Sequence, residues 1–470
     1  MPVITTGINF TDNPATEQSL WPLIKPSLHL DFKSESLGPL NWSKTETNRT
    51  STYLNSSGFV KKAMLGAPRF THNPTTLRPE GLLLEPQATN TFAYSESTSS
   101  YGSDFFITIA ADDYQSPDGT TKADRWKESD AASRAQHWKE HSLSVITGQV
   151  HTISMFVRPD GDRNVFGLHF FPDNSAFGSG MCWFDCTGDG SVLYNDLPGF
   201  DQCVAGMPTI VKYPRGWYRI SASNKATATA TGYFSYRYTK QGNVDASNGS
   251  IGNYTGDTSR GPWIWGIQNE LGSISSYMPT EGGTSTRLSD SGPSNEGLYM
   301  SGTAVEDFYS QGKGTWFIVS TGPTNLYTNG TNHHLITLSN AANDDASAYQ
   351  VRYNGVARLA SWGSFSSIVS EWNFHEPAAF AYVPYRRYVA ALALDDVAET
   401  TKFWCYDPLD TGTTLRYYED TSSTKRTDIA NLRVGSYTNG SQPYLGTIES
   451  IRYYPERLTD AQIEHMIKRI

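Results

Sequence analysis

Turn-forming residues divide this sequence into short segments. It contains 40 Gly and 24 Pro among 470 residues, and they recur along its whole length. Both residue types interrupt helices and mark turns, so short strands joined by turns are favoured over long helices. The sequence therefore predicts an all-β fold, and its length predicts two or three domains that each bury a core.

Alternating patterns between about residues 95 and 288 predict a first antiparallel β-sandwich. Segments 151–159, 216–223 and 232–240 each alternate apolar and polar residues, as strands with one buried face do. The residues expected to face the core are Ile153, Met155, Val157, Tyr218, Ile220, Ala222, Phe234, Tyr236 and Tyr238.

A second sandwich is expected at residues 289–470. The stretch 281–297 is rich in Gly, Ser, Thr and Asp, which favours a domain boundary there. Strands are expected near residues 314–322, 333–339, 388–394, 432–438 and 447–454. Thr459 and Gln462 form a capping-box pattern before an apolar stripe, so a helix should end the chain and pack back on this sandwich.

The first 94 residues are less regular. Residues 1–28 are polar with scattered apolar anchors, which favours an arm that attaches to another chain. Residues 29–94 are expected to be extended or in short strands leading into the first sandwich, with a hairpin turn at Ser57 and Gly58.

Charge and hydropathy exclude several classes of partner. The formal net charge is −10 with no cluster of Lys and Arg, so nucleic acid is not an expected partner. No signal peptide pattern and no apolar run of membrane-spanning length is found, so membrane insertion is not expected either.

Blocks of the first 290 residues resemble a phage family. The stretch Arg78 to Glu96 carries the pattern Gly-Leu-Leu-x-Glu-x-x-x-Thr-Asn, which is similar to a segment preceding a jelly-roll in phage structural and tail proteins. Further blocks begin at Ser116, Gly148 and Gly216, and a long one ends at Arg287. Together they resemble a phage domain of the carbohydrate-binding-module type.

The C-terminal part is similar to concanavalin A-like, laminin-G-like lectin domains of phage proteins. The resemblance rests on YVAALALDDVAETTKFWCYD and YLGTIESIRYYPERLTDAQIEHM. It departs from the family pattern around Cys405, and no calcium-ligand set is recognisable, so the resemblance implies the fold rather than a metal or cofactor.

Enzyme signatures are not found. Nucleophile, zinc, phosphate-loop and dinucleotide motifs are missing, and acidic residues such as Asp395 and Asp396 would point to opposite faces of a strand. Four cysteines, Cys182, Cys186, Cys203 and Cys405, are too few for a disulfide framework and are expected to be reduced structural thiols, although a local bridge among the first three stays open.

Aromatic residues in loops are the candidate ligand contacts. Trp217 and Trp265 lie in strand patterns and are expected in the core. The candidate ligand-binding residues are Trp362, Trp372, His375, Tyr437 and Asn439, because they fall in loops rich in Ser, Gly, Thr and Asn.

These patterns and resemblances favour a non-enzymatic surface protein of a phage particle, a head decoration, head fibre or tail fibre. It would attach to capsid or tail proteins through residues 1–28, form a homo-oligomer, a trimer by resemblance, and bind host-surface glycan weakly. Two alternatives remain: a virion-borne glycosidase or polysaccharide lyase, and a capsid cement protein without a ligand.

Overall fold

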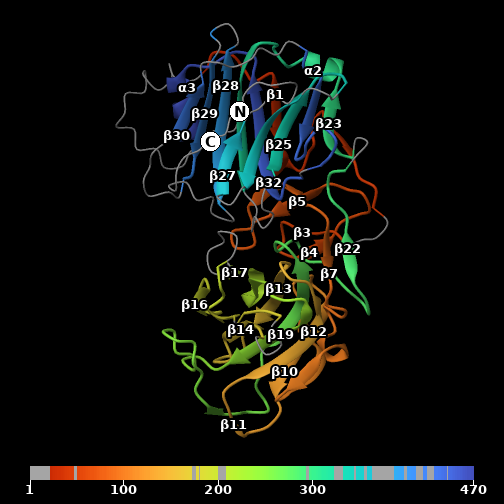
Figure 1. Ribbon diagram of the computed structural model, residues 1–470, viewed down its shortest axis with the longest axis vertical. Helices are drawn as coiled ribbons and strands as arrows, with labels where there is room; N and C mark the ends of the chain where they lie inside the picture. Colours follow the sequence, from red (N-terminus) through yellow and green to blue (C-terminus); the bar gives the residue numbers. More distant parts are fainter. Residues whose placement is uncertain are drawn as a thin grey trace.

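The computed structural model describes residues 22–46, 50–171, 176–178, 180–199, 208–292, 296–321, 332–342, 346–353, 357–361, 386–395, 398, 400–408, 416–420, 428–441 and 443–470. They form two lobes of antiparallel sheets, one above the other in Figure 1. The all-β prediction is confirmed. Neither α-helix of the described residues is long and apolar enough to cross a membrane.

The upper lobe in Figure 1 is a sandwich of two sheets. The first sheet has the order β30 (Arg416–Asp420), β29 (Thr400–Tyr406), β28 (Arg387–Asp395), β24 (Lys313–Thr321), β32 (Gly446–Tyr454), β6 (Pro79–Leu84) and β5 (Arg69–His72), with β1 (Leu28–Asp31) also paired to β32. The second has the order β2 (Asn41–Ser43), β23 (Gly297–Ser301), β31 (Asn431–Val434), β25 (Asn332–Ser339), β26 (Ala346–Tyr353) and β27 (Ala357–Ser361). All five predicted C-terminal strands are present.

Two helices accompany this sandwich, α2 (Thr303–Glu306) and α3 (Asp460–Ile467). The Thr459 side chain accepts from the N–H of Gln462, and the Gln462 side chain accepts from the N–H of Thr459, so the predicted capping box is confirmed. Ile463 and Met466 are buried against the face of the first sheet that points away from the sandwich core. The helix thus packs back on the sandwich, as expected.

The N-terminal segment belongs largely to this same upper lobe. Strand β1 pairs with β32, β6 pairs with the start of β32, and β2 pairs with β23. The core between the two sheets includes Leu28, Leu30, Phe32, Leu82 and Leu84. Residues 29–94, expected to lead into the first sandwich, therefore contribute four strands to the second one, and the lower lobe is an insertion within it.

The lower lobe is a jelly-roll sandwich of two six-stranded sheets. The inner sheet, nearer the upper lobe's connecting strands, has the order β17 (Thr209–Lys212), β18 (Tyr218–Lys225), β13 (Val150–Arg158), β21 (Trp263–Leu271), β10 (Thr121–Glu128) and β9 (Ile107–Gln115). The outer sheet has the order β16 (Ser191–Asn195), β15 (Gly180–Asp185), β14 (Val165–Phe170), β19 (Ala230–Thr239), β12 (His137–Val145) and β8 (Ser103–Phe105). The nine residues predicted to face the core all lie in one buried cluster between these sheets.

Short strand pairs and turns complete the described fold. The remaining elements are β3 (Thr52–Leu54) with β4 (Val60–Lys62), β7 (Ala88–Asn90) with β22 (Ser285–Arg287), β11 (Ser133–Arg134) with β20 (Tyr254–Thr255), and the 3-10 turns η1 (Phe32–Ser34), η2 (Thr98–Ser100) and η3 (Pro214–Gly216). The chain leaves the upper lobe through β7 and returns beside it through β22 (Figure 1).

The hairpin β3–β4 fastens the lobes together through apolar contacts. Leu54 and Val60 pack with Phe156, Trp217 and Trp265 on the inner sheet's surface. The predicted turn is present, with Gly58 at φ +75°, a conformation that L-residues with a side chain rarely adopt. Trp217 and Trp265 are buried as predicted, but in this junction and not between the sheets of a sandwich.

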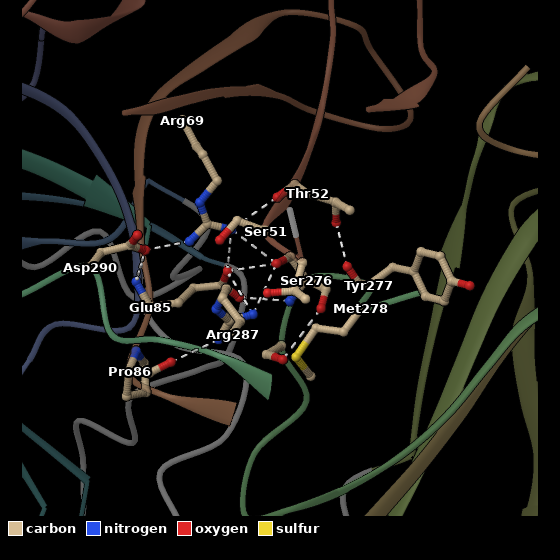
Figure 2. A network of polar contacts seen from close by, with 12 residues as sticks. Ser51, Thr52, Arg69, Glu85, Pro86, Ser276, Tyr277, Met278, Arg287 and Asp290 are labelled. Atoms are coloured by element: carbon tan, nitrogen blue, oxygen red, sulfur yellow. Dashed lines mark hydrogen bonds and ion pairs between the residues drawn. The ribbon is translucent and has the colours of Figure 1, made fainter. Parts of the chain in front are cut away.

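A buried polar network lies beside this hairpin (Figure 2). Arg69 Nη1 donates to Glu85 Oε2 at 2.6 Å, and Arg69 Nη2 pairs with Asp290. Arg287 Nη1 lies 3.2 Å from Glu85 Oε2, and Ser276 donates to Glu85 through its N–H and its hydroxyl. Lys44 and Glu46 extend the network, so three cations face three carboxylates. The segment predicted as a linker thus carries buried ion-pair partners as well as an exposed turn at 281–284.

Candidate functional site

One row of residues crosses the whole outer sheet of the jelly-roll. It comprises Phe105, Trp138, Arg237, Gly167, Trp183 and Tyr194, each paired with the next and each from a different strand. Directly paired residues of antiparallel strands point to the same face. Because Phe234, Tyr236 and Tyr238 of β19 face the core, this row faces away from it.

The row is closed at one end. Trp183 is fully buried and lies against Gly167, where an added Cβ would come within 2.7 Å of the Trp183 ring. Gly249 approaches the ring of Tyr194 closely enough to leave no room for a side chain. The tight contact with Gly167 explains why a residue without a side chain occupies the centre of the row.

The other end of the row presents aromatic surface. The rings of Phe105 and Trp138 are stacked, with centroids 4.7 Å apart and an interplanar angle of 8°, and both side chains are half-buried. His169 and Phe171, at the end of the neighbouring strand β14, are also half-buried, with ring centroids 4.4 Å apart. Flat apolar rings beside polar groups are suited to the faces of sugar rings, whose C–H patches are apolar. We call Phe105, Trp138, His169, Phe171 and Arg237 the outer-sheet site.

Arg237 lies at the centre of this site and is only 5% exposed. Its Nε donates to Ser235 Oγ at 2.7 Å, its Nη1 to Gln136 Oε1 at 2.8 Å, and its Nη2 to His169 Nδ1 at 2.7 Å. The guanidinium also lies 5.4 Å from the Trp138 ring centroid and 5.0 Å from that of Phe171. Every one of these partners is neutral or an aromatic ring.

The electrostatics follow from this environment. Burial lowers the pKa of Arg237 to about 10, while Glu140 acts in the opposite direction. Burial, and then the charge of Arg237, lowers the pKa of His169 to about 3. His169 is therefore neutral near pH 7, and its Nδ1 is the acceptor because a guanidinium can only donate. The site thus presents one positive charge at neutral pH.

A second candidate is the cleft between the lobes, with a cavity of about 370 Å³. Tyr53, Asn73 and Glu80 line it from the N-terminal segment, and Tyr213 and Arg219 from the jelly-roll. Burial raises the pKa of Glu80, whose Oε1 accepts from Asn73 Nδ2 at 2.8 Å.

Several polar groups of this cleft are occupied within the protein, whereas Arg219 Nε and Thr447 Oγ1 are buried with no hydrogen-bond partner among the described residues. Arg219 Nη1 donates to the Ser275 carbonyl, and both oxygens of Glu85 accept from the buried network. Burial alone would raise the pKa of Glu85, but Arg287, Arg69 and Ser276 lower it to about 2. The Glu85 carboxylate is therefore ionised near pH 7 and is held by Arg69, Arg287 and Ser276.

Of the predicted ligand residues, only Tyr437 and Asn439 are among the described residues, and they lie at neither place. Trp362, Trp372 and His375 lie outside the described residues. Tyr437 and Asn439 lie in a tight turn after β31 in the upper lobe, where Gly440 N–H donates to the Tyr437 carbonyl and Ser441 N–H to Asn439 Oδ1. Tyr437 is half-buried, with its ring centroid 5.2 Å from that of His334, and Asn439 is exposed.

The outer-sheet site was not among the predicted sites. Its sequence signal is the alternation in 232–240, which places Arg237 on the face opposite Phe234 and Tyr236. The pairing of β19 with β12 and β14 is what brings Trp138 and His169 beside it, and no local pattern encodes that pairing.

Other reactive groups are structural among the described residues. Cys182, Cys186 and Cys405 are buried and form no disulfide bond among the described residues, and burial raises the pKa of the first two thiols. Cys203 lies outside the described residues. Asp395 Oδ1 accepts from the Ala398 N–H in a turn. No group of three or more His, Cys, Asp or Glu residues in the described part of the chain is arranged to hold a metal ion.

The sequence matches no family model and no curated protein. Among solved structures, it is similar to the CBM40 of Ruminococcus gnavus IT-sialidase bound to alpha2,3 sialyllactose, at 16% identity and a TM-score of 0.24, covering 34% of this chain and 83% of that one. The LG1-3 region of the laminin alpha2 chain is 12% identical, with a TM-score of 0.21, and the match covers 68% of this chain and 64% of that one. Domains LG4-5 of the mouse laminin alpha1 chain are 11% identical, with a TM-score of 0.19, and the match covers 85% of this chain and 96% of that one. At these TM-scores the likeness carries no argument about function.

Proposed function

We propose that this chain is a non-enzymatic surface protein of a bacteriophage particle that binds host-surface glycan through the outer-sheet site. The observation that carries the binding proposal is the half-buried aromatic surface of Phe105 and Trp138 beside polar groups in one row of the outer sheet. The inner sheet is fastened to the upper lobe, so this face is the one left to the jelly-roll for a ligand.

The phage setting is supported by the resemblance of residues 78–96 and the following blocks to phage structural proteins. In this setting residues 1–28 attach the chain to capsid or tail proteins. Residues 22–28 already pack on the upper lobe, where Ser27 N–H donates to the Tyr453 carbonyl at 2.9 Å. Because residues 22–28 have these contacts within the chain, we narrow the proposed attachment segment from residues 1–28 to residues 1–21.

Several copies are needed for useful adhesion. A platform of a few aromatic rings on an open sheet gives weak binding, and linked sites can raise avidity roughly 100-fold to 10,000-fold when the geometry allows simultaneous contact. We propose a homotrimer on the particle, as the resemblance implies. Cross-linking of intact virions followed by mass determination tests the copy number.

The binding site is tested by substitution of Trp138. Trp138→Ala removes the ring that stacks on Phe105, and we expect roughly tenfold weaker glycan binding, the equivalent of about 1.4 kcal/mol. Trp263→Ala is the matched control, because Trp263 is a half-buried tryptophan on the inner sheet. Binding to a glycan array and to host cells is the measurement, with circular dichroism to verify the fold.

Equal binding by wild type and Trp138→Ala would remove this site. Release of soluble sugar from host polysaccharide would establish the glycosidase or lyase alternative. Failure of the wild-type assembly to bind any host glycan would favour a capsid cement protein.

A further inference from the structure

The outer-sheet site contains a buried positive charge that no carboxylate of the described residues neutralises. Most other buried cations among the described residues pair with carboxylates within a few ångströms, and Arg433 is an exception that donates to the Glu296 backbone carbonyl. The described pairs are Arg69 with Glu85, Arg163 with Glu128, Arg287 with Glu85, Lys44 with Asp290, and Lys402 with Asp460. No described carboxylate lies within ion-pair distance of Arg237, whose three acceptors are all neutral.

A buried charge without a carboxylate partner lowers the stability of the fold. A buried ion without a counterion carries a desolvation penalty of several kcal/mol, and an apolar side chain of similar volume would avoid it. Neutral acceptors and aromatic rings recover only part of that penalty. Departures of this kind from the rules of folding are expected at functional sites.

Arg237 also retains hydrogen-bonding capacity. A guanidinium has five N–H groups, and three are used, one each on Nε, Nη1 and Nη2. One N–H on each terminal nitrogen therefore has no acceptor in the part of the chain that the structure describes. Two N–H groups on the two terminal nitrogens are what a carboxylate needs for a forked, two-oxygen contact.

The partners of Arg237 also fix its orientation. Gln136 and His169 each accept from a different terminal nitrogen, and Ser235 accepts from Nε, so the plane of the guanidinium is held before a ligand arrives. His169 stays neutral and adds no competing charge. A pre-oriented donor pair binds an anion at a lower entropic cost than a flexible side chain does.

From these observations we propose that the outer-sheet site selects carboxylated sugars, such as uronic acids, with Arg237 holding the carboxylate and Trp138 contacting the sugar ring. This specificity rests on the proposed glycan-binding function. It adds the chemical class of the ligand, and it names Arg237 as the residue that determines specificity.

The experiment uses the full-length assembled protein and three probes: a trigalacturonic acid, its methyl ester, and a sulfated galactose oligomer. We expect the acid to bind about 10-fold to 100-fold more tightly than the ester, as a charge-assisted hydrogen bond contributes. Arg237→Gln should remove this difference between the affinities for the acid and the ester. Arg237→Lys keeps the charge without the fork and should restore part of the preference.

The matched control is Arg158→Gln, which changes the net charge equally on the inner sheet and should keep the full preference. Thermal unfolding of each variant verifies folding, and the ratio of acid to ester affinity is a readout that a structural role for Arg237 would not move. Equal binding of acid and ester that depends on Trp138 would overturn the carboxylate proposal and leave glycan binding intact. Tighter binding of the sulfated probe would overturn it also, and binding of none of the probes or of any host glycan would remove both proposals.

Discussion

Arg69 and Arg237 are both buried, but they have different partners, so replacing each of them should change the stability of the protein differently. Arg69 contacts Glu85 and Asp290 and ties β5 to the segment that returns from the jelly-roll. Among the described residues, Arg237 contacts only neutral acceptors and rings. Loss of the first charge leaves three buried carboxylates facing two cations, whereas loss of the second removes an ion with no carboxylate partner among the described residues.

Arg69→Met should therefore lower the free energy of unfolding by about 3–5 kcal/mol, the usual cost of breaking a buried ion pair from one side. Arg237→Met should change it by less than about 1 kcal/mol, because the removed charge compensates for the lost hydrogen bonds. Urea unfolding at pH 7, followed by tryptophan fluorescence, measures both. A loss for Arg237→Met as large as that for Arg69→Met would mean that the guanidinium is compensated after all.

Two buried histidines make the jelly-roll sensitive to acid. Burial lowers the pKa of His141 to about 3, with smaller effects of His151 and Lys139, and burial lowers the pKa of His151 to about 4. Histidines of the unfolded chain titrate near about 6.5. Between these values the unfolded state binds more protons than the folded state, so stability falls as the pH drops from about 6.5 toward 4.

We expect the melting temperature of the jelly-roll to fall steadily over that pH range. His141→Phe should flatten the dependence, because the ring already stacks on Phe234 and Tyr236 and a phenyl ring does not titrate. Differential scanning calorimetry from pH 7.5 to 4.5 provides the comparison. An unchanged slope in the variant would show that His141 is protonated in the folded state.

At the scale of elements, alternation predicted the strands well. In β13 the apolar positions Ile153, Met155 and Val157 do face the sandwich core. The intervening Thr152 and Ser154 are also buried, since the inner sheet is covered on its other side and Thr152 bonds to Ser223. Alternation of apolar and polar residues predicts that one face of a strand is buried. It does not predict whether a hairpin from another part of the chain covers the second face.

Pairing between strands that are distant in the sequence could not be predicted from local sequence patterns. Strand β6 pairs with β32 more than 360 positions later in the chain, and Trp138 pairs with Arg237 across 99 positions. Neither contact leaves a trace in neighbouring residues, because register is set by the global arrangement of the sheets. For this reason the outer-sheet site emerged only from the structure, and four strands of residues 29–94 were assigned to a different sandwich from the one they join.

At the scale of the whole molecule, the upper lobe is built from two separated parts of the chain. Residues 289–470 alone lack β1, β2, β5 and β6 and the core residues these carry, so we expect that fragment to aggregate. A chain in which an Asn-Gly turn replaces residues 91–284 should fold, because Asn90 and Ser285 are direct partners and a two-residue turn can connect them.

A fragment of residues 88–287 should fold as well, since the core of the jelly-roll lies within it. Circular dichroism, calorimetry and size-exclusion chromatography of the three proteins test this division. A soluble, cooperatively folded 289–470 fragment would contradict it.

The pairing of β7 with β22 has a consequence for how such proteins can diversify. The two ends of the jelly-roll join the upper lobe side by side, through the paired strands β7 and β22. A different domain could therefore replace the jelly-roll without removing a strand from the upper lobe, provided that its own termini lie close together. The termini of domains are often close together. Exchange of the jelly-roll could thus change which ligand the protein binds while the strands and the core of the upper lobe stay the same.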